Sequence, residues 1–281
     1  MMKRFLIVDG SNLLFQMFYG MPARIVNKDG KAIQGTLGFV GALLKIIRMV
    51  EPTHVAVLFD GAAANERIEI NADYKANRID YSEVPEEENP FSQIDDVYRA
   101  LTYMGIKHAE TTVCETDDWI AGYVLNKETD SEIVISSFDS DFFQLITEKV
   151  SVLRYRGDKT VICTPEYIRE KFGIGPEQYA EFKSLTGDTA DNVKGADKVG
   201  PKTAAALMNE FGTLENLIAN AENIKKPSIR ASIIQNTERL HKNYQIIKLD
   251  GHVDLPFETK DLVYDYKGIT TNEVLLGIGL K

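Results

Sequence analysis

The 281-residue sequence contains only two cysteines, Cys114 and Cys163, and they belong to no paired motif. This excludes a disulfide framework and a cysteine-based zinc site, and it predicts a reducing, cytoplasmic compartment. The sequence has no apolar run of about 18 residues, so no membrane span is expected. The apolar stretch near the N-terminus stops at Asp9 and is too short for the core of a signal peptide.

Positive charge is scarce: 32 Lys and Arg stand against 42 Asp and Glu, which gives a net charge of −10. Taken alone, this balance argues against nucleic acid as a partner, because phosphate binding favours basic faces. The total does not show how the charges are distributed, however. If many carboxylates converge on cations in one pocket, the charge of the protein alone misleads about the metal-loaded protein.

Strand and helix patterns alternate through the first half of the chain. Short apolar runs predict strands over 4–9, 54–60, 106–110 and 132–137, and helical spacing predicts helices over 35–50, 91–104 and 117–128. This alternation predicts an α/β fold with a mainly parallel central sheet flanked by helices.

The pattern changes after about residue 165. Short helices separated by Gly and Pro follow, and the next strand is expected only at VDLPF (253–257). We therefore expect two units, an α/β core over 1–165 and a helical subdomain over 166–281.

Three predicted strands deliver an aspartate at or just after their carboxyl ends: Asp9, Asp60 and Asp139. In parallel sheets these ends meet at one edge, where ligands bind. Four further acids lie close to this edge in the predicted fold: Glu115, Asp117, Asp118 and Asp141. Taken singly, each of these acids is better explained as a helix cap or a surface group than as a metal ligand. The three strand ends and the turn that carries Glu115, Asp117 and Asp118 make four positions at this edge, and their coincidence favours a metal site.

The segment LTGDTADNVKG adds Asp188 and Asp191, whose spacing places both on one face of a helix or helical turn. Clustered carboxylates would raise one another's pKa and destabilise the fold unless cations compensate them. Ligands that are all oxygen select Mg²⁺ or Mn²⁺ over zinc. Two such ions about 4 Å apart form a phosphodiester-cleaving site, in which one activates water and the other stabilises the leaving oxygen.

The segment GADKVGPKTAAAL (195–207) resembles an anion site. Gly195 and Gly200 flank a short turn with Lys198 and Lys202 close by, and a helix begins near Pro201. A Gly-rich turn that leads into a helix N-terminus presents free N–H groups to phosphate. An ordinary connection that uses Gly for tight packing explains the same pattern.

The segment ADYKANR (72–78) combines an aromatic residue with two basic ones. A helix would align Tyr74, Lys75 and Arg78, so that the ring stacks on a base and the cations hold phosphates of a single strand. The alternative is a solvated amphipathic helix. The acidic loop SEVPEEEN that follows counts mildly against nucleic acid.

Seven motifs in this order resemble the bacterial 5′-3′ exonuclease or flap endonuclease family, and especially the 5′ nuclease domain of bacterial DNA polymerase I. They are VDG (8–10), FDG (59–61), YKANR (74–78), ETDD (115–118), DSD (139–141), GDTADN (187–192) and GADKVGPKTA (195–204). The resemblance covers about residues 3–260. It implies a PIN-like fold with a helical arch (about 62–90) and a helix–hairpin–helix (about 187–210), in a stand-alone member, since no polymerase domain follows.

The resemblance also assigns roles to residues of this sequence. All nine acids fall on metal-binding positions: Asp9, Asp60, Glu115, Asp117, Asp118, Asp139, Asp141, Asp188 and Asp191. The expected catalytic residues are Lys75, Arg78, Asp117 and Asp139. Lys75 and Arg78 fall on cations of the arch that steer the scissile phosphate onto the metals, and Asp117 and Asp139 fall on acids that hold the metals. The expected DNA-binding residues are Tyr74, Lys75, Arg78, Gly195, Lys198, Gly200, Lys202 and Thr203, and the hairpin of the family often binds K⁺.

The implied activity is that of a monomeric, structure-specific 5′ nuclease in DNA replication and repair. It would act on flapped, branched or gapped DNA, with RNA-primed DNA as a further candidate. Two positions depart from the family, which commonly has Arg where this chain has Gln16 and Gly where it has Lys198. Two rival functions are a structural binder of branched DNA and a small-molecule phosphohydrolase. The complete set of acids argues against the first, and the lysine-bearing hairpin and the Tyr-Lys-Arg segment argue against the second.

Overall fold

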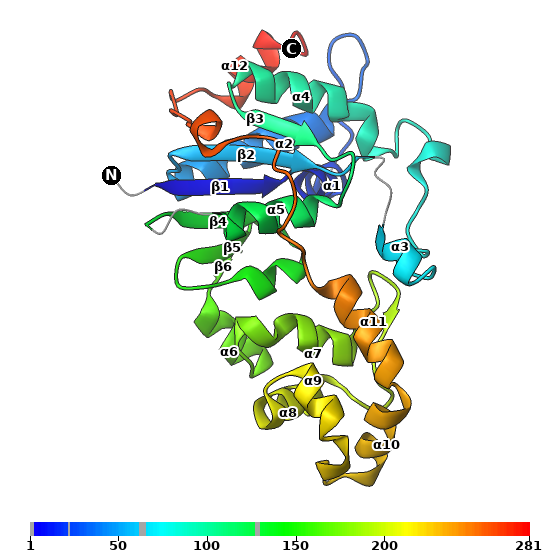
Figure 1. Ribbon diagram of the computed structural model, residues 1–281. Helices are drawn as coiled ribbons and strands as arrows, with labels where there is room; N and C mark the ends of the chain where they lie inside the picture. Colours follow the sequence, from blue (N-terminus) through cyan, green and yellow to red (C-terminus); the bar gives the residue numbers. More distant parts are fainter. Residues whose placement is uncertain (1–2, 22, 62–65, 127–129) are drawn as a thin grey trace.

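The computed structural model describes residues 3–21, 23–61, 66–126 and 130–281. Its centre is a six-stranded sheet in the order β3-β2-β1-β4-β5-β6, parallel except for β6 (Figure 1). The strands are β1 (Arg4–Asp9), β2 (His54–Phe59), β3 (Lys107–Glu110), β4 (Glu132–Ser136), β5 (Val150–Arg154) and β6 (Val161–Cys163).

The central strand β1 is buried on both faces of the sheet. Phe5 and Ile7 point into one hydrophobic cluster, and Leu6 and Val8 point into another. This two-sided burial explains the unbroken apolar run of the strand. The second cluster is formed with α1 (Gly10–Gly20), α2 (Gln34–Val50), α4 (Ile94–Tyr103) and α12 (Thr271–Gly277), and the first includes α5 (Thr116–Leu125).

Strand β1 pairs in parallel with β2 on one side and β4 on the other. The chain therefore builds the sheet outward in one direction, to β3, and then returns to build it in the other. Crevices at the carboxyl ends of strands where the order reverses are the usual ligand sites of such sheets. Here that position lies between the end of β1 and the end of β4.

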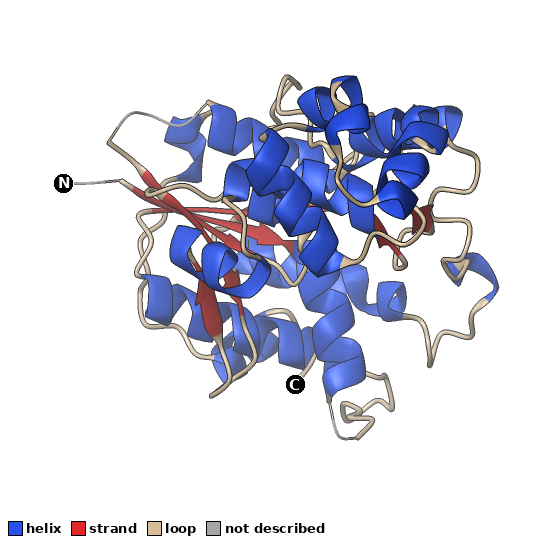
Figure 2. Cartoon of the chain, turned by 90° about the horizontal axis from the view of Figure 1, so that it is seen from below, coloured by secondary structure: helices blue, strands red, loops and turns tan. Residues whose placement is uncertain are grey.

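The helical second half lies beyond β6 in Figure 1, and Figure 2 views these helices from below. Its core is continuous with that of the sheet, because Phe143 after β4 packs against Tyr179 and Phe172. The helices are α6 (Pro165–Phe172), α7 (Tyr179–Thr186), α8 (Pro201–Phe211), α9 (Leu214–Ala219), α10 (Pro227–Gln235) and α11 (Thr237–Ile247). A small hairpin, β7 (Gly187–Asp188) and β8 (Val193–Lys194), connects α7 toward α8.

Over the described residues, the four strands expected in the first half and the three helices between them are confirmed within a few residues. Residues 127–128 of the helix expected over 117–128 lie outside the described residues. The strand expected at 253–257 is wrong: this segment forms no β-ladder and crosses α5, where Leu255 lies against Gly122. Pro256 removes a backbone donor, which explains why an apolar segment does not pair as a strand. Strands β5 and β6 and helix α1 were not expected.

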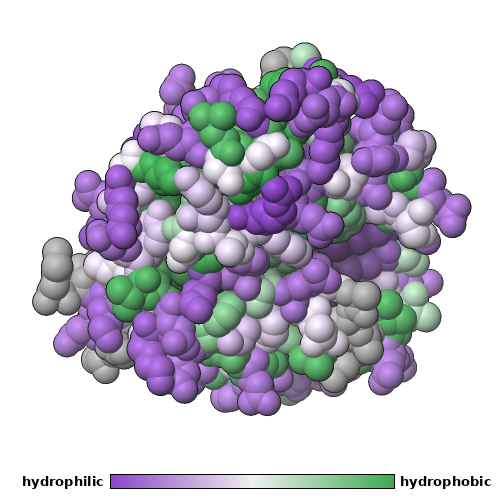
Figure 3. Space-filling model, turned by 90° about the horizontal axis from the view of Figure 1, so that it is seen from above, coloured by the Kyte–Doolittle hydropathy of each residue, from purple (hydrophilic) through white to green (hydrophobic). Residues whose placement is uncertain are grey.

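No helix in the described part of the chain is long and apolar enough to span a membrane. The face viewed from above in Figure 3 is mostly hydrophilic, with hydrophobic residues in small groups. Scattered groups of this kind are normal for a protein surface.

Candidate active site

Four carboxylates meet at the carboxyl ends of the strands. Asp9 ends β1, Asp60 follows β2, Asp139 follows β4, and Asp117 lies in the first turn of α5. All four line one cavity of about 900 Å³. In the described part of the chain none of the four forms an ion pair; the arch and α7 cations described below pair with other carboxylates.

The cost of placing these charges together is visible in their pKa values. Burial, followed by the charges of Asp60 and Asp139, raises the pKa of Asp9 to about 7. Burial and the carboxylates of Asp139, Asp60 and Asp9 raise the pKa of Asp117 well above its usual range. Such mutual destabilisation is what a bound divalent cation relieves.

Local hydrogen bonds fix two of these acids. Asp9 caps α1, because its Oδ1 accepts from the N–H of Asn12 at 2.9 Å, while its Oδ2 accepts from Ser137 Oγ at 2.8 Å. The Asp141 N–H donates to Asp139 Oδ1 at 2.8 Å, so Asp139 also forms a tight turn. The two explanations of the Asp-x-Asp motif are therefore compatible, since one oxygen of Asp139 shapes the turn and the carboxylate still lines the cavity.

A second group of carboxylates comprises Asp141, Asp188 and Asp191, which offer oxygens within 4.8 Å of one another. Asp188 ends β7 and Asp191 lies in the turn before β8. The spacing does bring Asp188 and Asp191 together, as expected, but across the turn of a β-hairpin (189–192) and not on a helix. The range expected for a helix–hairpin–helix, 187–210, contains this β-hairpin and α8. The helix before the hairpin is α7, which ends at Thr186, just before that range begins.

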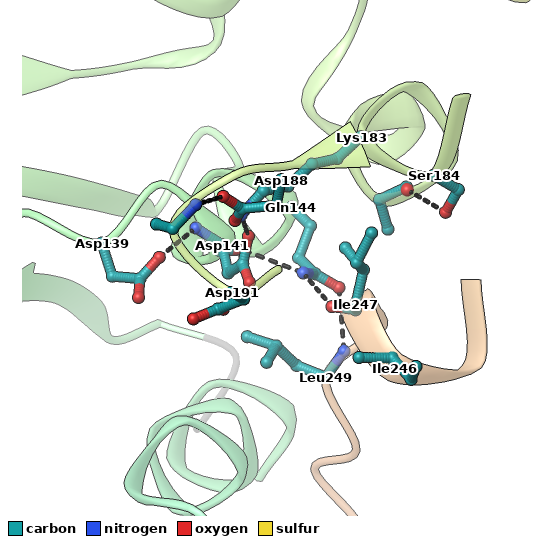
Figure 4. A network of polar contacts seen from close by, with 12 residues as sticks. Asp139, Asp141, Gln144, Lys183, Ser184, Asp188, Asp191, Ile246, Ile247 and Leu249 are labelled. Atoms are coloured by element: carbon teal, nitrogen blue, oxygen red, sulfur yellow. Dashed lines mark hydrogen bonds and ion pairs between the residues drawn. The ribbon is translucent and has the colours of Figure 1, made fainter. Parts of the chain in front are cut away.

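Lys183 of α7 lies among these acids (Figure 4). Its ammonium contacts Asp141 and lies 2.5 Å from Asp188 Oδ2. Burial lowers the pKa of Lys183, but the charges of Asp141, Asp139 and Asp188 raise it by more, so the pKa lies above its usual range. Burial raises the pKa of Asp141 to about 7 even with the lysine beside it.

The arch segment supplies three more cations, which pair with acids at the site. Arg67 on α3 (Glu66–Ile70) contacts Glu115 at 2.6 Å, Asp118 at 2.7 Å and the Ile246 carbonyl at 2.8 Å. Lys75 Nζ lies 2.5 Å from Glu115 Oε1. Arg78 Nη2 lies 2.7 Å from Asp191 Oδ1.

The expected helix over 72–78 is wrong. The segment forms turns, and Lys75 has a φ of 57°, a left-handed value that a helix does not contain. Tyr74 is buried with Ile246 and Ile247 of α11 and donates to Glu115 Oε2 at 3.2 Å. The tyrosine thus fixes the arch to the helical half and presents no exposed stacking face. Residues 62–65 of the expected arch lie outside the described residues.

Asp118 faces away from the other acids. Its Oδ1 accepts from Arg67 and from the Asp250 N–H at 2.9 Å, and it does not line the cavity. Its geometry is that of an anchor for the arch arginine and for the chain after α11.

The loop before α8 combines a packing role with an open surface. A Cβ on Gly195 would lie 2.4 Å from the Leu185 carbonyl oxygen, so this glycine serves close packing. Gly200 has open space beside it, and Lys198 and Lys202 are exposed while Thr203 is half-buried. Lys198 has a φ of 66°, a conformation that Gly adopts without strain.

Two residues that pair with acids of the site, Arg67 and Lys183, are not in the expected set. Gln16, which departs from the family pattern, does not line the cavity. Gln16 donates to the Tyr155 carbonyl at 2.5 Å, so its side chain ties α1 to the chain after β5. Lys183 shares α7 with a second charged residue, Glu181, so the helix pattern alone does not mark it as part of a buried ion pair. Arg67 carries no such signal either, since its partners are distant in sequence.

Asp9 predicts a pH dependence of stability in the metal-free protein. Because its folded pKa of about 7 exceeds its ordinary value of 3.8, its contribution is fully present below about pH 4 and is lost as pH rises through 7. Asp9→Asn removes this loss. In EDTA, denaturant unfolding should show the variant to be more stable by about 2–4 kcal/mol above pH 7.5, with the difference vanishing near pH 4. A difference independent of pH would contradict the raised pKa.

Comparison with known proteins places these features in context. A family model described as "5′-3′ exonuclease, N-terminal resolvase-like domain" matches residues 4–173, and one described as "5′-3′ exonuclease, C-terminal SAM fold" matches residues 174–269. The chain is 35% identical to the thermostable DNA polymerase I of Thermus filiformis over 257 residues. This alignment covers 91% of this chain and 29% of that protein. The chain thus spans less than a third of that relative.

A 5′-3′ exonuclease of Aquifex aeolicus is 32% identical over 264 residues, which cover 93% of this chain and 86% of that protein. Among solved structures, the flap endonuclease of bacteriophage T5, in a pseudo-enzyme-product complex with DNA and metal ions, superimposes with a TM-score of 0.71. The identity is 22%, over 87% of this chain and 89% of that one. At this identity the likeness shows the fold.

Proposed function

The chain belongs to the 5′-3′ exonuclease family of metal-dependent nucleases, and we propose that it cleaves flapped, branched or gapped DNA from a 5′ single strand. The observation that supports this proposal is a set of four carboxylates in one cavity that form no ion pair with any described residue: Asp9, Asp60, Asp117 and Asp139. Replication and repair are the processes that generate such substrates, and RNA-primed DNA is a further candidate.

The donor set fits hard divalent cations. All the candidate ligands are carboxylates, which suits Mg²⁺ with Mn²⁺ as a substitute. One ion would be held by Asp9, Asp60, Glu115, Asp117 and Asp139, and a second by Asp141, Asp188 and Asp191. When bound, such ions lower the pKa of a water and neutralise charge on the leaving oxygen. Asp118 would instead hold Arg67 in place.

The cations of the chain would position the DNA. Lys75 and Arg78 lie on the wall of the same cavity as the carboxylates, where they can contact the scissile phosphate. Gly200, Lys202 and Thr203 at the start of α8, with Lys198 before it, would contact the duplex backbone through N–H groups and ammonium charge. A K⁺ ion bound at the loop before α8 would add to these contacts with the duplex backbone, but the proposal does not require one.

A cleavage assay tests the function. A 5′-labelled flap substrate is incubated in Mg²⁺ and in EDTA, beside a plain single strand and a 3′ flap. The proposal expects Mg²⁺-dependent release of a short 5′ product from the 5′ flap. Tight binding without cleavage in Mg²⁺ or Mn²⁺ would favour a structural binder, with Gln16 and Lys198 as the first suspects. Turnover of a generic phosphate ester, unaffected by competing DNA, would favour a small-molecule phosphohydrolase.

A further inference from the structure

The two carboxylate groups at the site differ in how their charge is compensated. In the described residues, Asp9, Asp60, Asp117 and Asp139 form no ion pair, whereas two of the three acids in the second group contact one buried lysine. Lys183 Nζ contacts Asp141 and lies 2.5 Å from Asp188 Oδ2, and its side chain is only 9% exposed. Figure 4 shows the Lys183 side chain reaching from α7 toward Asp188 and Asp141.

The position of Lys183 is fixed by the fold. It lies on α7, which packs against α8, α11 and the short helix after β4 that begins at Asp141. The neighbouring Ser184 donates to the Ala180 carbonyl within α7, and the flanking Phe182 and Leu185 are in the core. The ammonium therefore has little room to leave its partners, in contrast to Arg78, whose side chain is 53% exposed beside Asp191.

We propose that Lys183 is an internal counter-ion that makes the second metal position weaker than the first. This inference rests on the proposed function. The ammonium contacts two of the three carboxylates that would ligate the second cation. It holds Asp141 and Asp188 together when no cation is bound, and it repels a divalent cation when one enters. A buried charge acts strongly on its neighbours because little water screens it.

At the first position the internal cations meet only one of the five acids that would hold the ion: Lys75 and Arg67 of the arch both pair with Glu115. In the described residues the other four, Asp9, Asp60, Asp117 and Asp139, form no ion pair, so most of the charge at this position is left uncompensated. The order of filling follows from this difference. A cation should occupy the group of Asp9, Asp60, Asp117 and Asp139 first, and the group of Asp141, Asp188 and Asp191 only at higher concentration.

The test is a Mn²⁺ titration of the full chain without DNA, with free Mn²⁺ measured by electron paramagnetic resonance. The wild type should bind one ion tightly and a second weakly. Lys183→Met, which keeps the volume and removes the charge, should tighten the second class by roughly tenfold or more and leave the first unchanged. Lys242→Met is the matched control, since Lys242 forms an exposed pair with Glu238 on α11 and should leave both classes unchanged.

Thermal unfolding supplies a second readout. Lys183→Met should unfold at a lower temperature than the wild type in EDTA, and Mn²⁺ should raise its unfolding temperature more than it raises that of the wild type. If the Met variant does not fold, Lys183→Gln keeps a hydrogen-bond donor without the charge and repeats both measurements. An unchanged or weakened second class in the folded variant would overturn the proposal.

The outcome is separable from that of the proposed function. Mn²⁺ binding is measured without a nucleic acid substrate, so a protein that cleaves no DNA still gives the two binding classes. Conversely, a protein that cleaves 5′ flaps while its Lys183→Met variant binds Mn²⁺ like the wild type would refute only the role of the lysine.

Discussion

Asp117→Asn should abolish cleavage of a 5′ flap in Mg²⁺, a loss of more than about a thousandfold, and leave DNA binding in Ca²⁺ largely intact. Asp117 lines the cavity, where the carboxylates of Asp139, Asp60 and Asp9 raise its pKa, so the amide keeps the shape of the cavity and removes one ligand charge. Asp139→Asn should behave in the same way. The expected duplex contacts, at Lys198 and Lys202, belong to another element and should be unaffected.

The measurement pairs single-turnover cleavage with fluorescence anisotropy on the same substrate. Asp29→Asn, in an exposed turn that does not line the cavity, is the matched control and should cleave normally. In EDTA the Asp117→Asn variant should be at least as stable as the wild type, because it removes a carboxylate that its neighbours repel. Activity retained in Mg²⁺ would refute the assignment of Asp117.

The convergence of the strand-end acids could be predicted from the sequence for a physical reason. Parallel strands place their carboxyl ends at one edge, so an acid at the end of each apolar run predicts a shared position without knowledge of the loops. Asp9, Asp60 and Asp139 meet on this basis alone. The spacing between Asp139 and Asp141 is short enough that the turn itself fixes their relation.

The cations could not be placed in this way, because their partners are distant in sequence. Arg67 contacts Asp118 and the Ile246 carbonyl, and Lys183 contacts Asp141, so each pair depends on how α7, α11 and the arch pack. The same packing overrides local preference at Lys75, whose N–H donates to the Asp191 carbonyl while its backbone is left-handed. A helical reading of 72–78 considers only local spacing and misses these contacts.

Lys75→Ala should slow cleavage at saturating enzyme by roughly a hundredfold while changing the Kd for duplex DNA by less than about threefold. Lys75 Nζ lies 2.5 Å from Glu115 and lines the cavity with Asp117 and Asp139, so its charge acts at the reacting phosphate. The measurement is single-turnover cleavage of the 5′ flap, together with anisotropy on a duplex of the same sequence.

Lys202→Ala is the matched comparison, because Lys202 is an exposed lysine at the start of α8, on a different element from the arch. Lys202→Ala should show the reverse pattern, with weaker duplex binding and a nearly unchanged cleavage rate at saturating enzyme. The slope of log affinity against log salt should fall by about one, the amount expected for the loss of one phosphate contact. Together the two variants separate chemistry from binding. An equal loss of rate and affinity in Lys75→Ala would mean that the arch only binds DNA and that the carboxylates act without a cation from the arch.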